Sequence, residues 1–443
     1  METPIVDFLT KYAADGTVRA HMPGHKGRAG GVPFAECFPY DITEICGADS
    51  LYEAEGIIRQ SEQNAASIFG AYATLYSTAG STLAIQTMLA AAANGRKGSI
   101  IAARNAHRSF INAAIFLGLD VEWVYPRETS GILSGSFSPS DIESAVNSAD
   151  DPIAVYLTSP DYLGYMSDIA AVSLICKKYN LLLLVDAAHG THLRFLPDGN
   201  AHALAQGADL CCNSAHKSIP YALTGCAYLH IANPDYADNA KLYMSMFGSS
   251  SPSYLALASL DICNRYMSDR MGNDLKLTIS EIDELKRLLS PRFDILKTEP
   301  LHLTISAGGT GHTGSDLANI LRRHGIECEY ADESYLTLML SPSNTREEYE
   351  RIFNALNEIQ FIDSAAVPSP IRLPKLEKCM TMRDAALSPS ETVKIDDAPG
   401  RIAAITRTHC PPCVPIAVSG EKISRECINI FKRYSISDIN VIK

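Results

Sequence analysis

Several features that would place the chain in a common class are missing from its 443 residues. It has no apolar run near the ~18 residues that cross a bilayer, and residues 1–16 lack the basic and then apolar pattern of an export signal. Positive charge is in deficit, with 38 Lys and Arg against 50 Asp and Glu, whereas nucleic-acid binding requires a basic face. We therefore expect a cytoplasmic protein with neither a membrane nor a nucleic-acid partner.

The twelve cysteines do not favour a disulfide-rich fold, because they are scattered along the chain. Cys176, Cys211 and Cys226 lie in apolar runs, and in a long chain without an export signal such residues are expected to be reduced and buried. Only Cys410 and Cys413 have CxxC spacing. A redox pair and half a metal site are the alternatives to a plain Pro-rich loop. Since no second CxxC exists, we favour the loop and predict no metal site.

Short apolar runs alternate with helical stretches between residues 72 and 231. Strands are predicted at 73–77, 99–103, 121–125, 153–158, 181–186, 209–213 and 226–230, and helices at 82–93, 109–117, 141–148 and 168–179. Uninterrupted apolar strands that alternate with helices indicate a mostly parallel sheet with both faces covered. Because such sheets bind ligands at the carboxyl ends of their strands, functional residues are expected there.

The rest of the chain is predicted to form smaller units. Helices are expected at 252–267, 274–289 and 424–434, and a β-α-β-β-α pattern at 301–306, 315–323, 326–330, 336–340 and 347–356. A composition break at Ser290-Pro291 and a Pro-rich linker at 366–374 separate these parts. We predict an N-terminal arm (1–25), a major domain that binds the cofactor (26–290), a small α/β lobe (291–365) and a C-terminal region (366–443).

The first motif, Thr78-Ala79-Gly80-Ser81-Thr82, lies between a predicted strand and a predicted helix. Small residues let the backbone close around a phosphate, and N–H groups at a helix start favour an anion. The hydroxyls of Ser81 and Thr82 add donors. An ordinary capped turn has the same pattern, so the motif is weak alone.

The second motif contains Asp186, which ends an apolar strand and precedes Ala187-Ala188-His189-Gly190. A carboxylate there costs stability unless a positive or protonated group meets it, and the protonated ring nitrogen of a pyridine cofactor is such a group. A helix N-cap and a metal site with His189 and His192 are the alternatives. Metal is less favoured, because the residues between the two histidines do not suggest a rigid helical pair.

The third motif contains Lys217, which follows the next strand in Asn213-Ser214-Ala215-His216-Lys217. A lysine in a partly desolvated pocket loses its proton readily and can attack an aldehyde, and Ser214 and His216 could reach a phosphate. A solvated lysine is the usual alternative. Lys217 lies one β-α step after Asp186 on the same sheet edge. This position favours a reactive lysine over a solvated one.

The fourth motif, Asn105-Ala106-His107-Arg108-Ser109, follows the strand at 99–103. The His107 ring could stack on a pyridine ring, and a capping or surface histidine is the alternative. Together the motifs supply a phosphate cup, a stacking ring, an acid for the ring nitrogen and a lysine on successive strand ends. This combination favours an enzyme that uses pyridoxal 5′-phosphate (PLP).

With these motifs the chain resembles the bacterial ornithine/lysine/arginine decarboxylase family, which are PLP enzymes of the aspartate-aminotransferase fold. The resemblance rests on His21-Met-Pro-Gly-His-Lys26, Tyr40-Asp-Ile-Thr-Glu44, Thr158-Ser-Pro160, Val185-Asp186, Ala188-His-Gly190, Ser214-Ala-His-Lys217, Ser250-Ser-Pro-Ser-Tyr254 and Gly400-Arg-Ile402. It covers nearly the whole chain and implies the short form of the family, without an N-terminal wing domain. The implied fold is α/β, with a mostly parallel sheet in the large domain and a smaller α+β C-terminal lobe.

The resemblance also implies a role for each matching residue. Lys217 forms the Schiff base with PLP, Asp186 pairs with the ring nitrogen, and His107 stacks on the ring. Lys217 or His216 returns a proton to Cα, so that a basic amino acid yields its amine and CO2. The other implied cofactor-binding residues are Gly80, Ser81, Thr82, Ala188, His189, Ser214 and His216, with Ser250 or Ser249 reaching the cofactor of the other subunit. The active site then lies at a subunit interface, and a homodimer is the minimum assembly.

Several positions depart from the family pattern and bear on the substrate. Ala187 stands in place of Glu, Asp161 of Thr, Gly225 of Gln, Ile405 of Glu, Cys410-Pro-Pro-Cys413 of Tyr-Pro-Pro-Gly, and Ser419-Gly-Glu421 of Pro-Gly-Glu. A cationic substrate side chain requires an acidic partner, which Asp161 could supply. Arginine, lysine and ornithine stay unranked. A family enzyme with an altered substrate or reaction, and a PLP-binding homologue without catalysis, are the alternatives.

Overall fold

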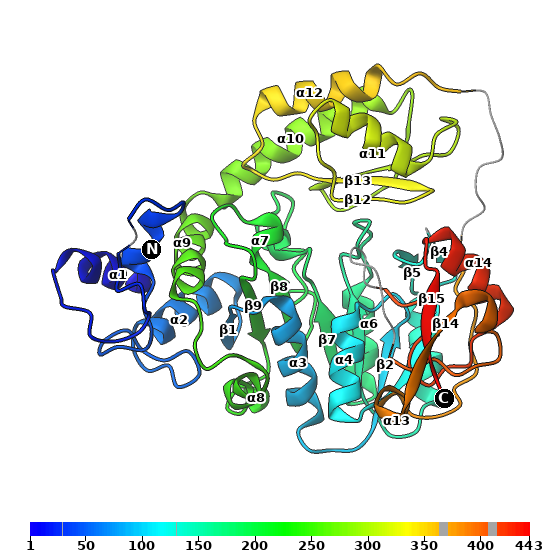
Figure 1. Cartoon of the computed structure of the whole chain (residues 1–443), viewed down its shortest axis with the longest axis horizontal. Coiled ribbons are helices and arrows are strands. Elements are labelled where there is room, and N and C mark those ends of the chain that lie inside the picture. Colours follow the sequence, from blue (N-terminus) through cyan, green and yellow to red (C-terminus); the bar gives the residue numbers. More distant parts are fainter. Residues whose placement is uncertain (29, 130, 363–370, 406–413) are drawn as a thin grey trace. The chain divides into compact units, whose positions relative to one another are not determined.

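The computed structural model describes residues 1–28, 30–129, 131–362, 371–405 and 414–443 (Figure 1). The predicted loop at Cys410 and Cys413, and residues 366–370 of the predicted linker, lie outside the described residues. The chain divides into two compact units. The first comprises residues 1–95 and 182–276, and the second comprises residues 96–181 and 277–443.

Four strands of the first unit lie side by side in the order β1 (Ala73–Ser77), β9 (Ala227–Ile231), β8 (Leu210–Ser214) and β7 (Leu182–Asp186). Strands β7 and β8 are parallel, and β9 is antiparallel to both β8 and β1. Every residue of β7, β8 and β9 is buried, as expected for strands covered on both faces. The carboxyl ends of β7 and β8 therefore lie at one edge of the sheet.

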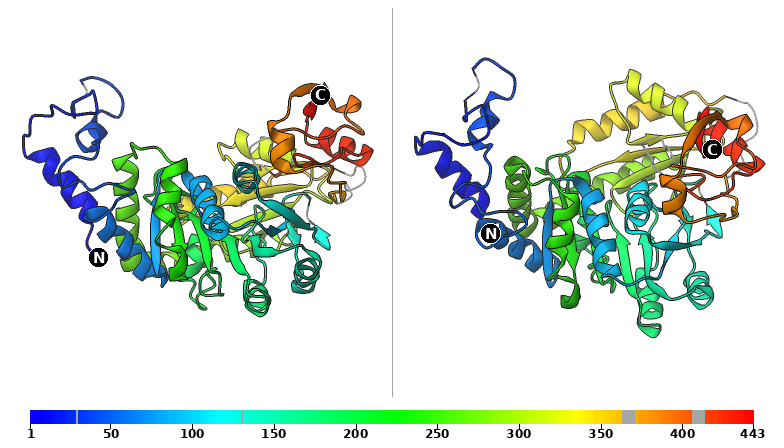
Figure 2. Two further views of the ribbon diagram at one scale, coloured as in Figure 1. Left: turned by 90° about the horizontal axis from the view of Figure 1, so that it is seen from below. Right: turned by 60° about the horizontal axis from the view of Figure 1, so that its bottom comes forward.

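Helices surround these strands. They are α1 (Pro4–Ala14), α2 (Ile57–Phe69), α3 (Gly80–Ala93), α7 (Ala215–Ser218), α8 (Ala240–Phe247), α9 (Tyr254–Asp269) and the first part of α10 (Met271–Leu289). The Ala-rich α3 contacts all four strands, because small side chains let a helix approach a sheet closely. The N-terminal α1 contacts α2 and α9 (Figure 2). Buried Asp261 of α9 holds α1 in place, since its Oδ2 accepts the backbone N–H groups of Ile5 and Val6 at 2.9 and 3.1 Å.

The second unit contains β6 (Pro152–Thr158), β2 (Ser99–Ala103) and β3 (Asp120–Val124), and β2 is parallel to both neighbours. Helices α4 (Arg108–Leu117), α5 (Pro139–Ser148) and α6 (Ile169–Lys178) accompany them, with a short hairpin of β4 (Glu128–Thr129) and β5 (Gly135–Ser136). The β-α alternation predicted for this stretch is present.

Two further substructures complete the second unit. Antiparallel strands β10 (Asp294–Ile295), β11 (His302–Ser306), β13 (Tyr335–Met339) and β12 (Tyr330–Ala331) form a small sheet with α11 (Gly314–Arg323) and α12 (Arg346–Asn357). The C-terminal part contains α13 (Met382–Leu387), the antiparallel pair β14 (Ser390–Lys394) and β15 (Asp438–Ile442), and α14 (Arg425–Arg433). Among the residues described, none of the helices combines the length and apolar character that crossing a membrane requires.

Candidate active site

Asp186 ends β7 and lies opposite Cys212 of β8 in the parallel register. Its side chain is buried, and its Oδ1 accepts hydrogen bonds from the backbone N–H of Ala188 at 3.1 Å and from the Cys212 thiol at 3.4 Å. A buried carboxylate is tolerated only when it is hydrogen-bonded or paired with a positive group. The side chain therefore has the burial and the acceptor chemistry that a protonated ring nitrogen requires.

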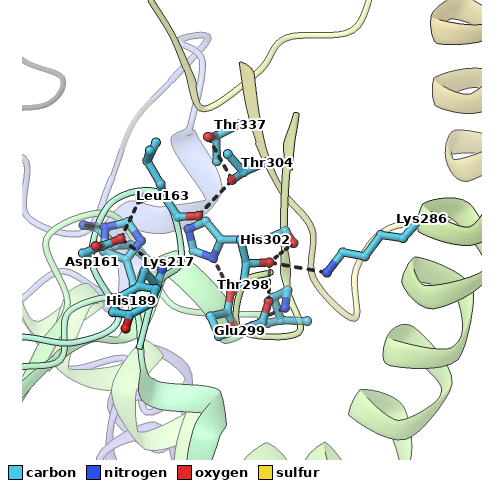
Figure 3. Close-up of polar contacts among 12 residues, drawn as sticks. Asp161, Leu163, His189, Lys217, Lys286, Thr298, Glu299, His302, Thr304 and Thr337 are labelled. Carbon is cyan, nitrogen blue, oxygen red and sulfur yellow. Dashed lines mark hydrogen bonds and ion pairs between the residues drawn. The ribbon is translucent and has the colours of Figure 1, made fainter. Parts of the chain in front are cut away.

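Lys217 lies on α7, which begins directly after β8. Its half-buried Nζ is 2.8 Å from Nε2 of His189, a buried residue of the loop that follows Asp186 (Figure 3). The lysine therefore extends from the end of β8 toward the loop after β7. This contact joins the second and third sequence motifs.

Backbone contacts fix the two strand ends relative to each other. The Asn213 side-chain amide donates to the carbonyl of Ala187 at 2.7 Å, and the Ala187 N–H donates to the carbonyl of Cys212 at 3.0 Å. The Ser214 N–H donates to the carbonyl of Ala188 at 3.3 Å. Because each strand end bonds the other, the side chains of Asp186 and Lys217 are presented from a common rigid base.

The first motif also lies at this sheet edge. The Ser214 hydroxyl donates to Ser81 Oγ at 3.0 Å, and Ala79, the N-cap residue of α3, makes no side-chain cap. Gly80 has a φ of 72°, and a Cβ placed on it would meet nothing within 4 Å. The start of α3 therefore leaves room beside Gly80 for an anion at a helix N-terminus, as a phosphate site requires. Together with Asp186 and Lys217, these residues fit PLP.

His216 also lies on α7 and is half-buried, and its Nδ1 is 3.1 Å from the carbonyl oxygen of Cys226. Since a carbonyl can only accept, Nδ1 carries the proton in this contact. The contact fixes the ring orientation next to Lys217. Roles for His216 in phosphate binding or proton return stay predictions.

His107 belongs to the second unit, where it caps α4. Its Nδ1 accepts the backbone N–H of Ser109 at 3.1 Å and lies 2.8 Å from the Ser109 hydroxyl. The capping role that was the alternative for this histidine is therefore present. Since Nδ1 is the acceptor, the proton of the neutral ring is on Nε2. Stacking on the cofactor ring stays a prediction.

Asp161, also in the second unit, is buried and shapes a turn. Its Oδ1 accepts the backbone N–H groups of Leu163 and Tyr165 at 3.1 and 3.0 Å, and burial raises its pKa to about 6. The Leu163 carbonyl in turn accepts from the Thr304 hydroxyl at 2.9 Å (Figure 3). Binding of a substrate cation by Asp161 stays a prediction, because the contacts seen here are those of a turn.

Ser249 and Ser250 follow α8 and are exposed. The Ser249 hydroxyl accepts the backbone N–H of Ser251 at 3.2 Å. Their predicted reach to the cofactor of another subunit stays a prediction. No set of three or more His, Cys, Asp or Glu side chains in the described ranges is arranged to hold a metal ion.

Two buried polar networks were not predicted from the sequence. Asn213 Oδ1 lies 2.7 Å from His202 Nε2 and 2.9 Å from His230 Nε2. These two imidazoles therefore fix the orientation of the Asn213 amide, which donates to the Ala187 carbonyl. In the second unit, Arg104 is buried three residues before His107 and donates to the carbonyls of residues 415 and 416 at 2.8 and 3.0 Å. The sequence does contain a signal for the Arg104 network, because Arg104 directly follows an apolar strand. A charged residue in such a place requires buried acceptors.

Two family models match the chain: Orn/Lys/Arg decarboxylase, major domain, over residues 3–297, and Orn/Lys/Arg decarboxylase, C-terminal domain, over residues 371–436. An arginine decarboxylase of Bacillus subtilis is 30% identical over 97% of this chain and 93% of its own length. One from Halalkalibacterium halodurans is 29% identical over 96% and 91%.

Among solved structures, the lysine decarboxylase LdcF of Francisella novicida matches with a TM-score of 0.84 and 17% identity, over 100% of this chain and 81% of that one. A NifS-like protein matches with a TM-score of 0.56 and 17% identity, over 70% and 91%. At these identities the structures are informative about the fold alone. The predicted α/β fold of PLP-dependent fold type I, with a mostly parallel sheet and a smaller C-terminal domain, is confirmed.

Proposed function

The chain belongs to the Orn/Lys/Arg decarboxylase family and is a PLP-dependent decarboxylase, and from this premise we propose that it converts a basic amino acid to the corresponding amine and CO2. Lys217 is the lysine that attaches the cofactor, and Asp186 is the partner of its ring nitrogen. The observation that supports these roles best is the 2.8 Å contact between Lys217 Nζ and His189 Nε2, because His189 belongs to the loop that starts at Asp186.

PLP, when bound, supplies an electron sink for the pair of electrons left on Cα when the carboxylate leaves as CO2. Asp186 keeps a proton on the ring nitrogen, because a charged acceptor in a buried site favours the protonated ring. The start of α3, with Ser81, Thr82 and Ser214, binds the phosphate. Lys217 or His216 returns one proton to Cα, which balances the loss of CO2.

Arginine is the first substrate to test. The two relatives described above carry the name arginine decarboxylase, and this name favours arginine over lysine and ornithine. The guanidinium group requires a planar acidic or carbonyl partner in the substrate pocket. The lysine decarboxylases among the solved structures are less similar in sequence, so lysine is the second choice.

A homodimer is proposed as the working assembly. Ser249 and Ser250 are exposed after α8, and an exposed hydroxyl pair is available to a phosphate of a second subunit. His107, whose Nδ1 accepts from Ser109, is proposed to stack on the ring.

The experiment is an amine-product screen by mass spectrometry with purified protein and added PLP. Arginine, lysine and ornithine are supplied separately, and we expect CO2 and the matching amine from at least one, with arginine fastest. Lys217→Ala should bind no PLP as a coloured species and form no amine. Lys276→Ala, an exposed lysine of α10, is the matched control. A PLP-loaded protein that releases no amine from any of the three would reject this substrate class.

A further inference from the structure

We propose that Cys212 is a positioning residue for the cofactor, because its thiol donates to Asp186 and so holds that carboxylate directed to the ring nitrogen. This role presumes the proposed function and adds a residue to it. The Cys212 Sγ lies 3.4 Å from Asp186 Oδ1. The two residues are direct partners in the β7–β8 register, so the contact is built into the sheet.

Both side chains of this pair are buried, with exposed fractions of 0% for Cys212 and 3% for Asp186. Water therefore contributes little to the solvation of the carboxylate, and a buried polar group requires hydrogen bonds from the protein instead. Oδ1 accepts such bonds from Cys212 and from the Ala188 N–H. These bonds fix the orientation of the carboxylate that is proposed to meet the ring nitrogen.

The thiol is held in the state that can donate. Burial, and then the nearby charge of Asp186, raises the pKa of Cys212 well above its usual value. The sulfur therefore retains its proton at neutral pH, and the S–H group can only donate to a carboxylate. A thiol is a weak donor, so its contribution is expected to be severalfold and not orders of magnitude.

A packing role and a donor role make opposite predictions for two substitutions. Valine is apolar and somewhat larger than cysteine, and it has no donor. Serine is smaller and more polar, but it keeps a donor at the same position. If Cys212 only filled space, valine should be the better substitute. If Cys212 donates to Asp186, serine should be the better substitute.

Cys211 is the matched control within the same strand. It has the same side chain, it is also 0% exposed, and burial raises its thiol pKa as well. Since successive side chains of a strand point to opposite faces, Cys211 faces away from the side on which Cys212 meets Asp186. Cys211→Val therefore tests the effect of a buried Cys-to-Val change in β8 without touching the carboxylate.

The experiment measures PLP affinity by titration of the full-length protein, together with the pH dependence of the absorption of bound PLP. Cys212→Val is expected to weaken PLP binding by about three- to tenfold, the range for the loss of one hydrogen bond of ordinary strength, because a thiol is a weak donor. It should also shift the pH dependence of the band. Cys212→Ser and Cys211→Val should stay within about twofold of wild type.

Three results would overturn the role. Cys212→Val could bind PLP as wild type does, Cys212→Ser could be as weak as Cys212→Val, or Cys211→Val could be equally weak. Cys212→Ala serves if the valine variant does not fold, and it should also weaken binding. A wild-type protein that binds no PLP would overturn the proposed function together with this role, whereas the three results above leave the proposed function intact.

Discussion

Replacing Arg104 by methionine removes a buried cation that joins β2 to the C-terminal part of the chain. Arg104 is 1% exposed, and its guanidinium donates to the carbonyls of Pro415 and Ile416 at 2.8 and 3.0 Å and to Glu421 Oε2 at 3.4 Å. The same Glu421 oxygen accepts the Val418 N–H at 2.7 Å. Methionine keeps the length of the side chain but none of its donors.

The expected loss of stability is large because the partners are buried. Removing one member of a buried ion pair costs about 3–5 kcal/mol, since the other charge stays uncompensated. Each carbonyl left without a donor adds about 1–3 kcal/mol unless it finds a new one. Glu421→Gln should cost less than Arg104→Met, because the amide can still accept from Val418. In the double variant the two losses should not add, with a coupling of about 0.5–3 kcal/mol.

The assay is urea unfolding followed by the fluorescence of Trp123. This is the only tryptophan in the sequence, and the Arg104 guanidinium lies 5.1 Å from the centre of its ring. Arg127, which binds Asp141 at the surface with two 2.6 Å contacts, is the control, and Arg127→Met should leave the midpoint nearly unchanged. The reasoning is refuted if Arg104→Met costs under about 1 kcal/mol, or if its loss and that of Glu421→Gln are simply additive.

The remaining predictions concern pH and the site. Burial lowers the pKa of His202 to about 4, and that of His230 well below its usual value. The unfolded chain therefore binds more protons, and stability should fall as pH decreases from about 6.5 toward 4. The protection factors of the β9 amides in hydrogen exchange, corrected for the intrinsic exchange rate at each pH, should be lower at pH 5 than at pH 7, and equal protection factors would contradict this. Asp161 has the opposite sign, because its folded pKa is raised to about 6, and stability should fall as pH rises from about 4 to 6. Asp161→Asn should therefore raise the free energy of unfolding at pH 8 by an amount on the order of 2 kcal/mol, seen as a higher urea midpoint of the Trp123 fluorescence. An Asp161→Asn midpoint at pH 8 equal to or below that of wild type would contradict this sign. Lys217→Ala should abolish amine formation while Lys276→Ala does not, and an active Lys217→Ala protein would refute the assignment of the lysine.

Much of the fold was predictable because its strands are short, apolar and bounded by polar turns. The strands at 73–77 and 99–103 have the predicted bounds, and most others differ by a residue. The strand predicted at 326–330 was wrong, since β12 contains only Tyr330 and Ala331. Its apolar positions are few, and hydrogen bonds to β13 decide its length.

The C-terminal pair β14 and β15 was not predicted. In β14 nearly every residue is exposed, so a sequence pattern of alternating burial is absent, and the strand forms because β15 provides its partner. The local sequence of β14 does not indicate that this partner strand exists. The same limit applies to Asn213 and the two histidines, whose contacts depend on the register of β8 against β9 and on the loop that contains His202.

For the site, the sequence indicated which residue types to expect at the strand ends but not their contacts. The position of Asp186 after an apolar strand and of Lys217 one β-α step later predicted a common sheet edge. The contact of Cys212 with Asp186 could not be predicted, because it depends on which residue of β8 lies opposite the end of β7. For His107, by contrast, the contact could be predicted. Its capping contact involves a residue close in the sequence, and a capping histidine was among the alternatives.

The proposed roles of all the site residues depend on the attachment of PLP to Lys217, beside Asp186. The most direct measurement is reduction of the PLP-loaded protein with borohydride, followed by proteolysis and mass spectrometry of the peptides. A phosphopyridoxyl mass on the peptide that contains Lys217, and at that residue, is predicted. A modified lysine elsewhere, with Lys217 unmodified, would contradict the account.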